Sequence, residues 1–147
     1  MKQAKWFLLL HVILGIYAGS SVCSKLAAQQ PFLSAAFIVL YGLMLQSGND
    51  AAVALAIYCG GTVEGFAQLM NDEARRIGLT GTHFENPNGL DNENHYSTAR
   101  DLAKLTAYAM KNEIFAKTVS TKSIQVGSRS LTNHNTVSYT HLTLPTK

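Results

Sequence analysis

Hydrophobic residues form two adjacent helix-length runs before the middle of the chain. Residues 32–46 are mainly apolar and uncharged, and residues 50–58 form a shorter run rich in alanine. Runs of this length and composition are typical of buried helices, so we expect two of them here. The polar step Ser47-Gly48-Asn49-Asp50 separates the two runs, and Gly60-Gly61 ends the second.

An amphipathic helix is predicted next. Thr62 is a good N-cap, because its side-chain oxygen can accept a hydrogen bond from a backbone N–H of the first turn. Gly78 followed by Leu79 is typical of a left-handed C-terminal cap with its apolar contact. The apolar residues between these caps recur at helical spacing on one face: Val63, Phe66, Ala67, Met70, Ala74 and Ile77.

The next segment is rich in turn-forming residues. Glycine, proline, asparagine and aspartate recur through residues 80–94, which predicts an ordered loop rather than a helix. Ser97 or Thr98 is expected to cap a further helix, whose apolar face holds Leu102, Leu105 and Ala109.

The C-terminal third predicts a short helix followed by a hairpin. The helix covers residues 113–120. Residues 123–126 and 129–132 can pair as strands around Gly127-Ser128, because a glycine-containing pair between two short strands favours a tight turn.

Composition and charge fit a globular domain and exclude some functions. The chain has 147 residues, of which 47% are hydrophobic and 14% charged, and this length can bury a core. The net charge of +3 gives no case for nucleic-acid binding. Cys23 and Cys59 cannot supply a disulfide framework, and no Cys/His cluster has zinc-ligand spacing. No metal or cofactor is expected.

The polar step offers a hydroxyl and an amide two residues apart. Gly48 lets the backbone turn without a Cβ penalty, so Ser47 and Asn49 can point into one cleft. A hydroxyl placed in this way can relay a proton, and an amide can hold a carbonyl. A serine and an asparagine that only cap a helix would show the same pattern, so the flanking sequence has to decide.

Four stretches in a fixed order carry a family resemblance: Ser47-Gly48-Asn49, residues 63–71, residues 81–91 with 95–103, and Leu131-Thr132-Asn133-His134-Asn135. Together they resemble the D-alanyl-D-alanine carboxypeptidases, which are low-molecular-weight penicillin-binding proteins with a Ser-x-Asn element. The resemblance implies an α/β (α+β) fold of β-lactamase type. This chain should hold mainly its helical cluster, with at most a short β-hairpin near the C-terminus.

The resemblance implies a reaction that needs three elements around one cleft. A serine in Ser-x-x-Lys attacks the D-Ala-D-Ala carbonyl, Ser-x-Asn relays a proton and holds the substrate, and a Lys-Thr-Gly strand binds the substrate carboxylate. Ser47 then resembles the catalytic proton-relay serine, and Asn49 the substrate-binding asparagine. No serine in the sequence has a lysine three residues later, and Lys-Thr-Gly is absent. We therefore expect a fragment without a nucleophile, inactive alone.

Composition and the extent of the resemblance together predict three segments. In residues 1–39, two lysines precede the apolar run 6–18 as in a secretory signal, and a mis-joined translation is the alternative interpretation. Residues 40–136 are expected to form a partial catalytic domain. Residues 137–147 do not continue the family pattern and look like translated sequencing-adapter read-through.

The resemblance implies trimming of the terminal D-Ala of peptidoglycan stem peptides outside the cytoplasmic membrane, and binding of β-lactams. A DD-endopeptidase would share the same three elements. A class A β-lactamase is disfavoured, because the middle element is Ser-Gly-Asn rather than Ser-Asp-Asn and residues 85–88 lack the deacylating Glu-x-x-Leu-Asn spacing. A third hypothesis is a non-catalytic small helical protein held at the membrane by residues 6–18.

Overall fold

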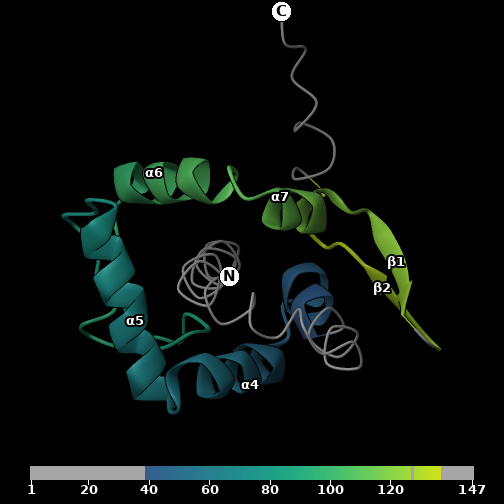
Figure 1. The fold of residues 1–147 in the computed structure, drawn as a ribbon, viewed down its shortest axis with the longest axis horizontal. Helices are drawn as coiled ribbons and strands as arrows, with labels where there is room; N and C mark the ends of the chain where they lie inside the picture. Colours follow the sequence, from purple (N-terminus) through teal and green to yellow (C-terminus); the bar gives the residue numbers. More distant parts are fainter. Residues whose placement is uncertain (1–38, 127, 137–147) are drawn as a thin grey trace, which may run out of the picture.

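A computed structural model describes residues 39–126 and 128–136 of the chain (Figure 1). Residues 39–46 are helical. The elements that follow are α4 (Asn49–Gly60), α5 (Val63–Arg76), α6 (Ala99–Ala109), α7 (Glu113–Ser120), β1 (Ser123–Val126) and β2 (Arg129–Thr132). The helices and strands predicted within these residues are confirmed. Residues 1–38 of the predicted signal-like segment lie outside the described residues, as do residues 32–38 of the predicted helix 32–46 and the whole predicted tail.

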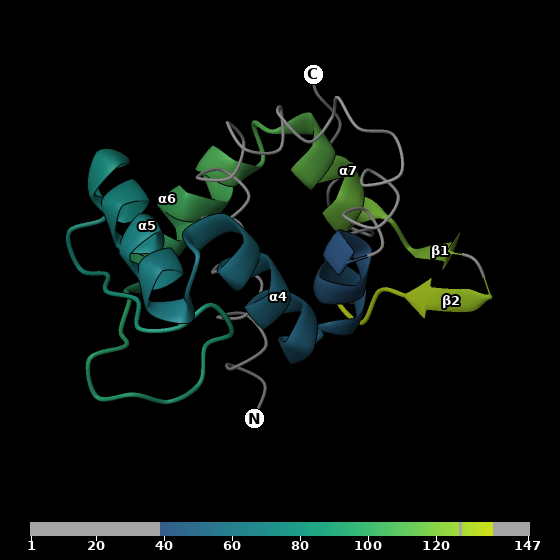
Figure 2. The same cartoon turned by 60° about the horizontal axis from the view of Figure 1, so that its bottom comes forward.

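The labelled helices follow one another around the molecule. In Figure 1, α4 runs along the bottom, α5 along the left side and α6 along the top, and α7 lies beside the hairpin. Figure 2 shows the long connection between α5 and α6 extending to one side and the β1–β2 hairpin to the other. Successive helices therefore meet at corners, and the residues at these corners determine the path of the chain.

Two glycines allow α4 and α5 to meet at a corner of 79°. A Cβ atom on Gly60 would lie 2.3 Å from the backbone nitrogen of Phe66, and one on Gly65 would lie 2.3 Å from the carbonyl oxygen of Gly60. Backbone lies directly against backbone, so neither position has room for a side chain. The predicted N-cap is confirmed, because Thr62 Oγ1 accepts a hydrogen bond from the Gly65 N–H at 2.9 Å.

The predicted glycine cap at the end of α5 is also confirmed. Gly78 has φ 74°, and its N–H donates to the carbonyl of Arg75 at 3.0 Å. The N–H of Leu79 donates to the carbonyl of Ala74 at 2.8 Å, and the Leu79 side chain is buried. Lys104 Nζ donates to the Gly78 carbonyl at 3.0 Å, so the cap also ties α6 to α5.

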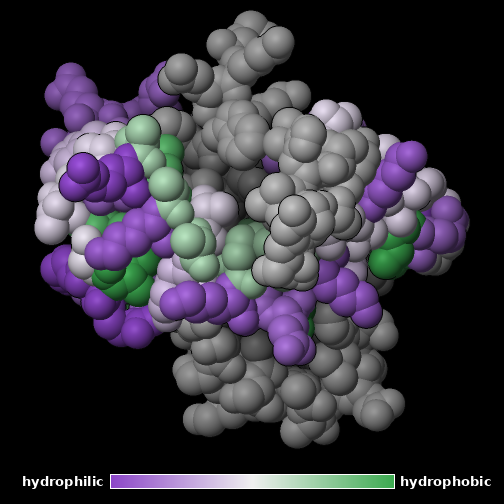
Figure 3. Space-filling model, turned by 90° about the horizontal axis from the view of Figure 1, so that it is seen from above, coloured by the Kyte–Doolittle hydropathy of each residue, from purple (hydrophilic) through white to green (hydrophobic). Residues whose placement is uncertain are grey.

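Every described helix contributes buried side chains to the core. They include Leu43, Met44, Leu45, Ala52, Ala56, Phe66, Met70, Ala74, Leu105, Ala109, Phe115 and Val119. α4 differs from α5, α6 and α7 because its apolar residues lie on every side, and Ile57 and Tyr58 are each 49% exposed. On the face drawn in Figure 3, hydrophobic areas are separated by hydrophilic ones.

The hairpin returns the chain to the first described helix. β1 and β2 are antiparallel, with Ser123 opposite Thr132 and Val126 opposite Arg129. After β2, the N–H of His134 donates to the carbonyl of Leu45 at 3.2 Å. The residues after β2 therefore lie against the end of the helix at 39–46.

No single helix in the described part of the chain is long and apolar enough to cross a membrane. Only α4 and α5 taken together, across their bend, have the length and composition of a membrane span.

We predict that Gly60→Ala lowers the free energy of unfolding of the full chain by about 2 kcal/mol, because the added methyl group overlaps the Phe66 backbone. Gly42→Ala is the matched control, since a Cβ atom there meets nothing within 4 Å. It should be neutral or stabilising by up to about 1 kcal/mol. Urea unfolding measures both, and equal effects of the two substitutions would contradict the backbone contact at the corner.

Candidate functional site

Ser47 lies between the helix at 39–46 and α4, in a conformation that is rare for its residue type. Its φ is 56°, and it is the one non-glycine residue with positive φ in the described part of the chain. This left-handed conformation costs an L-residue about 1–2 kcal/mol, and glycine usually occupies it after a helix, as Gly78 does here. The half-buried Ser47 is therefore held in a strained conformation at the candidate site.

The Ser47 hydroxyl and the Asn49 side chain are not used to cap a helix. Gly48 is the N-cap of α4, and no side chain caps that helix. Within the described residues, neither the Ser47 hydroxyl nor the Asn49 amide makes a hydrogen bond. Asn49 is exposed as the first residue of α4, where the helix dipole contributes partial positive charge. Neither side chain caps α4, so the helix-capping alternative is wrong.

Gly48 makes the turn compact. Its N–H points to the carbonyl of Gly42 at 3.4 Å, and its carbonyl accepts from Ala52 N–H at 3.1 Å. A Cβ atom on Gly48 would lie 3.1 Å from Asp50 Oδ1 and 3.5 Å from the Gly42 carbonyl oxygen. The glycine between the two candidate residues therefore fits closely between the ends of the two helices.

The segment 132–134, far away in sequence, supports the end of the helix at 39–46. The His134 N–H bonds to the Leu45 carbonyl, and Gln46 Nε2 donates to the Thr132 carbonyl at 2.7 Å. The last carbonyls of a helix lack partners within the helix, and the His134 N–H supplies one for the Leu45 carbonyl. The bond from Gln46 lies beside it, just before Ser47.

The buried Asn133 holds that segment in place. Its Nδ2 donates to the carbonyls of Val119 at 2.9 Å and Thr121 at 3.0 Å, at the end of α7. Its Oδ1 accepts from the N–H of Asn135 at 2.9 Å, and its own N–H donates to the Lys122 carbonyl at 2.9 Å. The Asn133 amide thus has partners at both ends, as a buried polar group requires.

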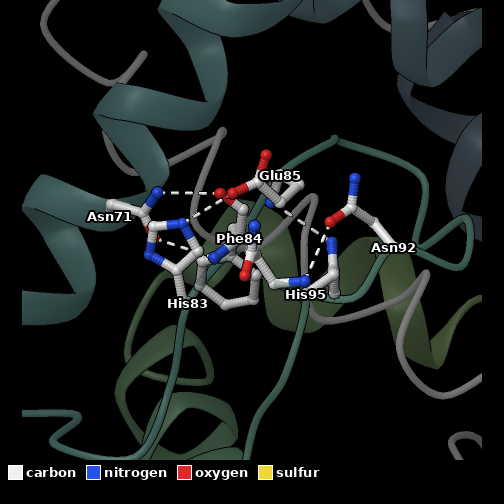
Figure 4. A network of polar contacts seen from close by, with 7 residues as sticks. Asn71, His83, Phe84, Glu85, Asn92 and His95 are labelled. Carbon is white, nitrogen blue, oxygen red and sulfur yellow. Dashed lines mark hydrogen bonds and ion pairs between the residues drawn. The ribbon is translucent and has the colours of Figure 1, made fainter.

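A second polar cluster anchors the loop between α5 and α6 (Figure 4). The buried Asn71 donates from Nδ2 to the Phe84 carbonyl and accepts at Oδ1 from the Phe84 N–H, both at 2.8 Å. His83 Nε2 lies 2.8 Å from Glu85 Oε1, and His95 Nδ1 accepts from the Glu85 N–H at 3.2 Å. These bonds hold the loop on α5, and both histidines take part in them.

Burial lowers the pKa of His95 below its ordinary value of 6.5. Charged His83 would lower it further, whereas Glu85 and Asp91 act in the opposite direction. Protonation would also place a proton on Nδ1, which accepts the Glu85 N–H. Within the described residues, no group of three or more His, Cys, Asp or Glu side chains is placed to hold a metal ion.

A family model of the D-alanyl-D-alanine carboxypeptidases matches residues 35–143. This match covers most of the chain and contains the Ser47 step, the anchored loop and the segment around Asn133. The chain belongs to the D-alanyl-D-alanine carboxypeptidase family. The match begins before residue 40 and ends after residue 136, and the predicted segment boundaries stay predictions.

Curated relatives carry the same activity in their names. The chain is 43% identical over 79 residues to the D-alanyl-D-alanine carboxypeptidase DacF of Bacillus subtilis, and 52% identical over 64 residues to DacC of Escherichia coli. It is 46% identical over 90 residues to the carboxypeptidase of a Streptomyces species. These alignments cover 54%, 44% and 57% of this chain, and 20%, 16% and 31% of the relatives. The chain therefore spans less than a third of the length of these relatives.

Solved structures confirm the predicted fold class. Penicillin-binding protein 6B of Escherichia coli matches with a TM-score of 0.71 at 26% identity, over 91% of this chain and 51% of that one. The Streptomyces K15 DD-transpeptidase matches with a TM-score of 0.65 at 37% identity, over 71% of this chain and 46% of that one. The chain is the mainly helical part of such a fold, with a two-stranded hairpin.

We predict that Ser47→Gly is more stable than Ser47→Ala by about 1 kcal/mol in the free energy of unfolding, because only glycine adopts positive φ without strain. Both variants lack the hydroxyl, so their difference isolates the backbone term. Urea unfolding of the full chain measures it. A Ser47→Ala variant as stable as Ser47→Gly would mean that residue 47 is not left-handed in solution.

We predict that the chain loses stability as the pH falls below about 6.5, because the unfolded His95 then binds a proton that the folded His95 resists. The stability that His95 contributes is complete above its pKa in the unfolded chain. It declines as the pH falls towards the lower pKa of His95 in the folded chain. Urea midpoints between pH 7.5 and 5.5 should decline less in His95→Gln. The control His134→Gln, which changes an exposed side chain, should keep the full decline. Identical pH profiles in His95→Gln and the unmodified chain would refute this.

Proposed function

We propose that residues 40–136 form part of the catalytic domain of a serine D-Ala-D-Ala carboxypeptidase. The complete enzyme removes the terminal D-Ala of peptidoglycan stem peptides through an acyl-enzyme, outside the cytoplasmic membrane, and is acylated by β-lactams. Membership of the family supports the activity. The observation that carries the assignment of the site is the left-handed Ser47, with a hydroxyl that caps no helix.

In this proposal, Ser47 relays a proton during acylation. The nucleophilic serine loses its proton as its oxygen bonds to the substrate carbonyl carbon, and the nitrogen of the departing D-Ala gains one as the C–N bond breaks. A hydroxyl can accept a proton on one side and donate one on the other. An orientation fixed by the backbone favours such a relay, because the reacting groups need not be reoriented during the step.

Asn49 is proposed to hold the substrate. Its amide can donate to a carbonyl of the stem peptide and accept from a backbone N–H of the same peptide. Its place at the N-terminus of α4 adds the favourable partial charge of the helix for a carbonyl oxygen. The sequence holds neither Ser-x-x-Lys nor Lys-Thr-Gly, so the proposal requires these elements from outside residues 1–147.

We expect the 147-residue chain alone to form no covalent adduct with penicillin, because it has no Ser-x-x-Lys nucleophile. Incubation with a fluorescent penicillin, followed by denaturing electrophoresis, should give no labelled band. A band that survives denaturation would show that a residue of this chain is itself acylated.

A chimera tests the roles of Ser47 and Asn49. Residues 40–136 replace the matching part of the Streptomyces K15 DD-transpeptidase, and acylation by the fluorescent penicillin is timed. Ser47→Ala and Asn49→Ala should each slow acylation by about 100-fold, which is the scale for loss of a proton relay or of a preorganised donor. Ser130→Ala and Asn94→Ala, which change exposed residues of the same types, should stay near the rate of the unmodified chimera.

An active chimera that tolerates both Ser47→Ala and Asn49→Ala would favour the non-catalytic alternative for this segment. Repeated release of D-Ala from an N-acylated peptide ending in D-Ala-D-Ala provides the second measurement, because each further turnover requires deacylation as well as acylation.

A further inference from the structure

We propose that Asn133 is a positioning residue for Ser47, acting through the segment Thr132-Asn133-His134, and that without it residue 47 leaves its left-handed conformation. The inference rests on the proposed function of Ser47 only for its effect on catalysis. Its conformational part concerns the chain alone.

The first step of the argument is that Ser47 needs external support. A non-glycine residue with φ of 56° persists only where its surroundings determine the backbone more strongly than the residue does. The residue makes no side-chain hydrogen bond within the described residues, so the support has to act on the backbone at its two sides.

The second step is where this support comes from. If the helix at 39–46 continued, the Leu45 carbonyl would bond to the N–H four residues later, at Asn49. Instead, the Leu45 carbonyl accepts from the His134 N–H at 3.2 Å. The neighbouring Gln46 donates to the Thr132 carbonyl at 2.7 Å. The two bonds, on either side of Asn133, end the helix where the chain must turn at Ser47.

The third step is that Asn133 fixes these two partners. Its side chain is 4% exposed, and Nδ2 holds the carbonyls of Val119 and Thr121 at the end of α7. Its Oδ1 accepts from Asn135, one residue beyond His134. Replacing the side chain would remove its bonds to the Val119 and Thr121 carbonyls and release the segment that bonds to the end of the helix at 39–46.

Asn71 provides a matched control elsewhere in the molecule. It is also a buried asparagine, 6% exposed, and both ends of its amide bond to backbone groups. Its partner is Phe84 in the loop after α5, and neither bond involves the segment 132–134 or the Ser47 step. Loss of either asparagine should therefore destabilise the fold, but only loss of Asn133 should change the conformation of residue 47.

The test uses NMR on the full 147-residue chain. A residue with positive φ gives a strong NOE between its own amide proton and Hα, and the exchange rate of the His134 amide reports the bond to Leu45. In Asn133→Ala, we expect the Ser47 NOE to fall to the level of the helical residues and His134 exchange to speed up at least tenfold. In Asn71→Ala, both should stay unchanged.

If Asn133→Ala fails to fold, the same NMR measurements on Gln46→Ala test the inference instead. It removes only the bond to the Thr132 carbonyl, and we expect a partial loss of the Ser47 NOE with faster His134 exchange. Gln68→Ala, which removes a helical glutamine that bonds to Asp72 on the same helix, is its control. A Ser47 NOE that stays strong in the folded variants of Asn133 and Gln46 overturns the inference.

The chimera separates this inference from the proposed function. Asn133→Ala should slow acylation at least tenfold at a temperature where it and Asn71→Ala are both folded, with Asn71→Ala unaffected. A lost Ser47 NOE with unchanged acylation would refute the catalytic role of Ser47 and leave the positioning role standing. Slowed acylation with an unchanged NOE would refute the positioning role instead.

Discussion

The strained backbone of Ser47 is the constraint on which the candidate site depends. Glycine at position 47 would have no such strain. Gly78 after α5 adopts a similar positive φ without it. Serine costs about 1–2 kcal/mol more than glycine in this conformation, and the proposed proton relay gives its hydroxyl a use. The helix before it and the helix after it both bury side chains in the core, so moving either one would disturb the core packing.

The site combines local and distant contributions. Gly48 and the start of α4 set the spacing of the hydroxyl and the amide, and this part of the geometry is local. The end of α7 and the residues after β2 support the end of the preceding helix, and the bond from Gln46 to Thr132 spans 86 positions. The hairpin thus contributes to the site although it carries neither candidate residue.

Local patterns in the sequence were enough to predict the elements. The helix caps at Thr62 and Gly78 and the strand pair at the end all follow from short-range spacing, and they are confirmed. The contacts of Asn133 could not be predicted, because its side chain bonds to backbone carbonyls and a backbone N–H, which almost every residue has. The contact of Gly60 with Phe66 was missed for a similar reason, since a glycine pair predicts a helix end but not a close approach. The positive φ of Ser47 contradicts its residue preference, so no propensity could indicate it.

The most direct test of the account is a crystal structure of the chimera acylated by a β-lactam. The account predicts that residue 47 keeps a positive φ, with its hydroxyl facing the acylated serine and the Asn49 amide within hydrogen-bond distance of a carbonyl of the bound β-lactam. A Ser47 hydroxyl that bonds to the first turn of α4, with Asn49 turned to solvent, would contradict it.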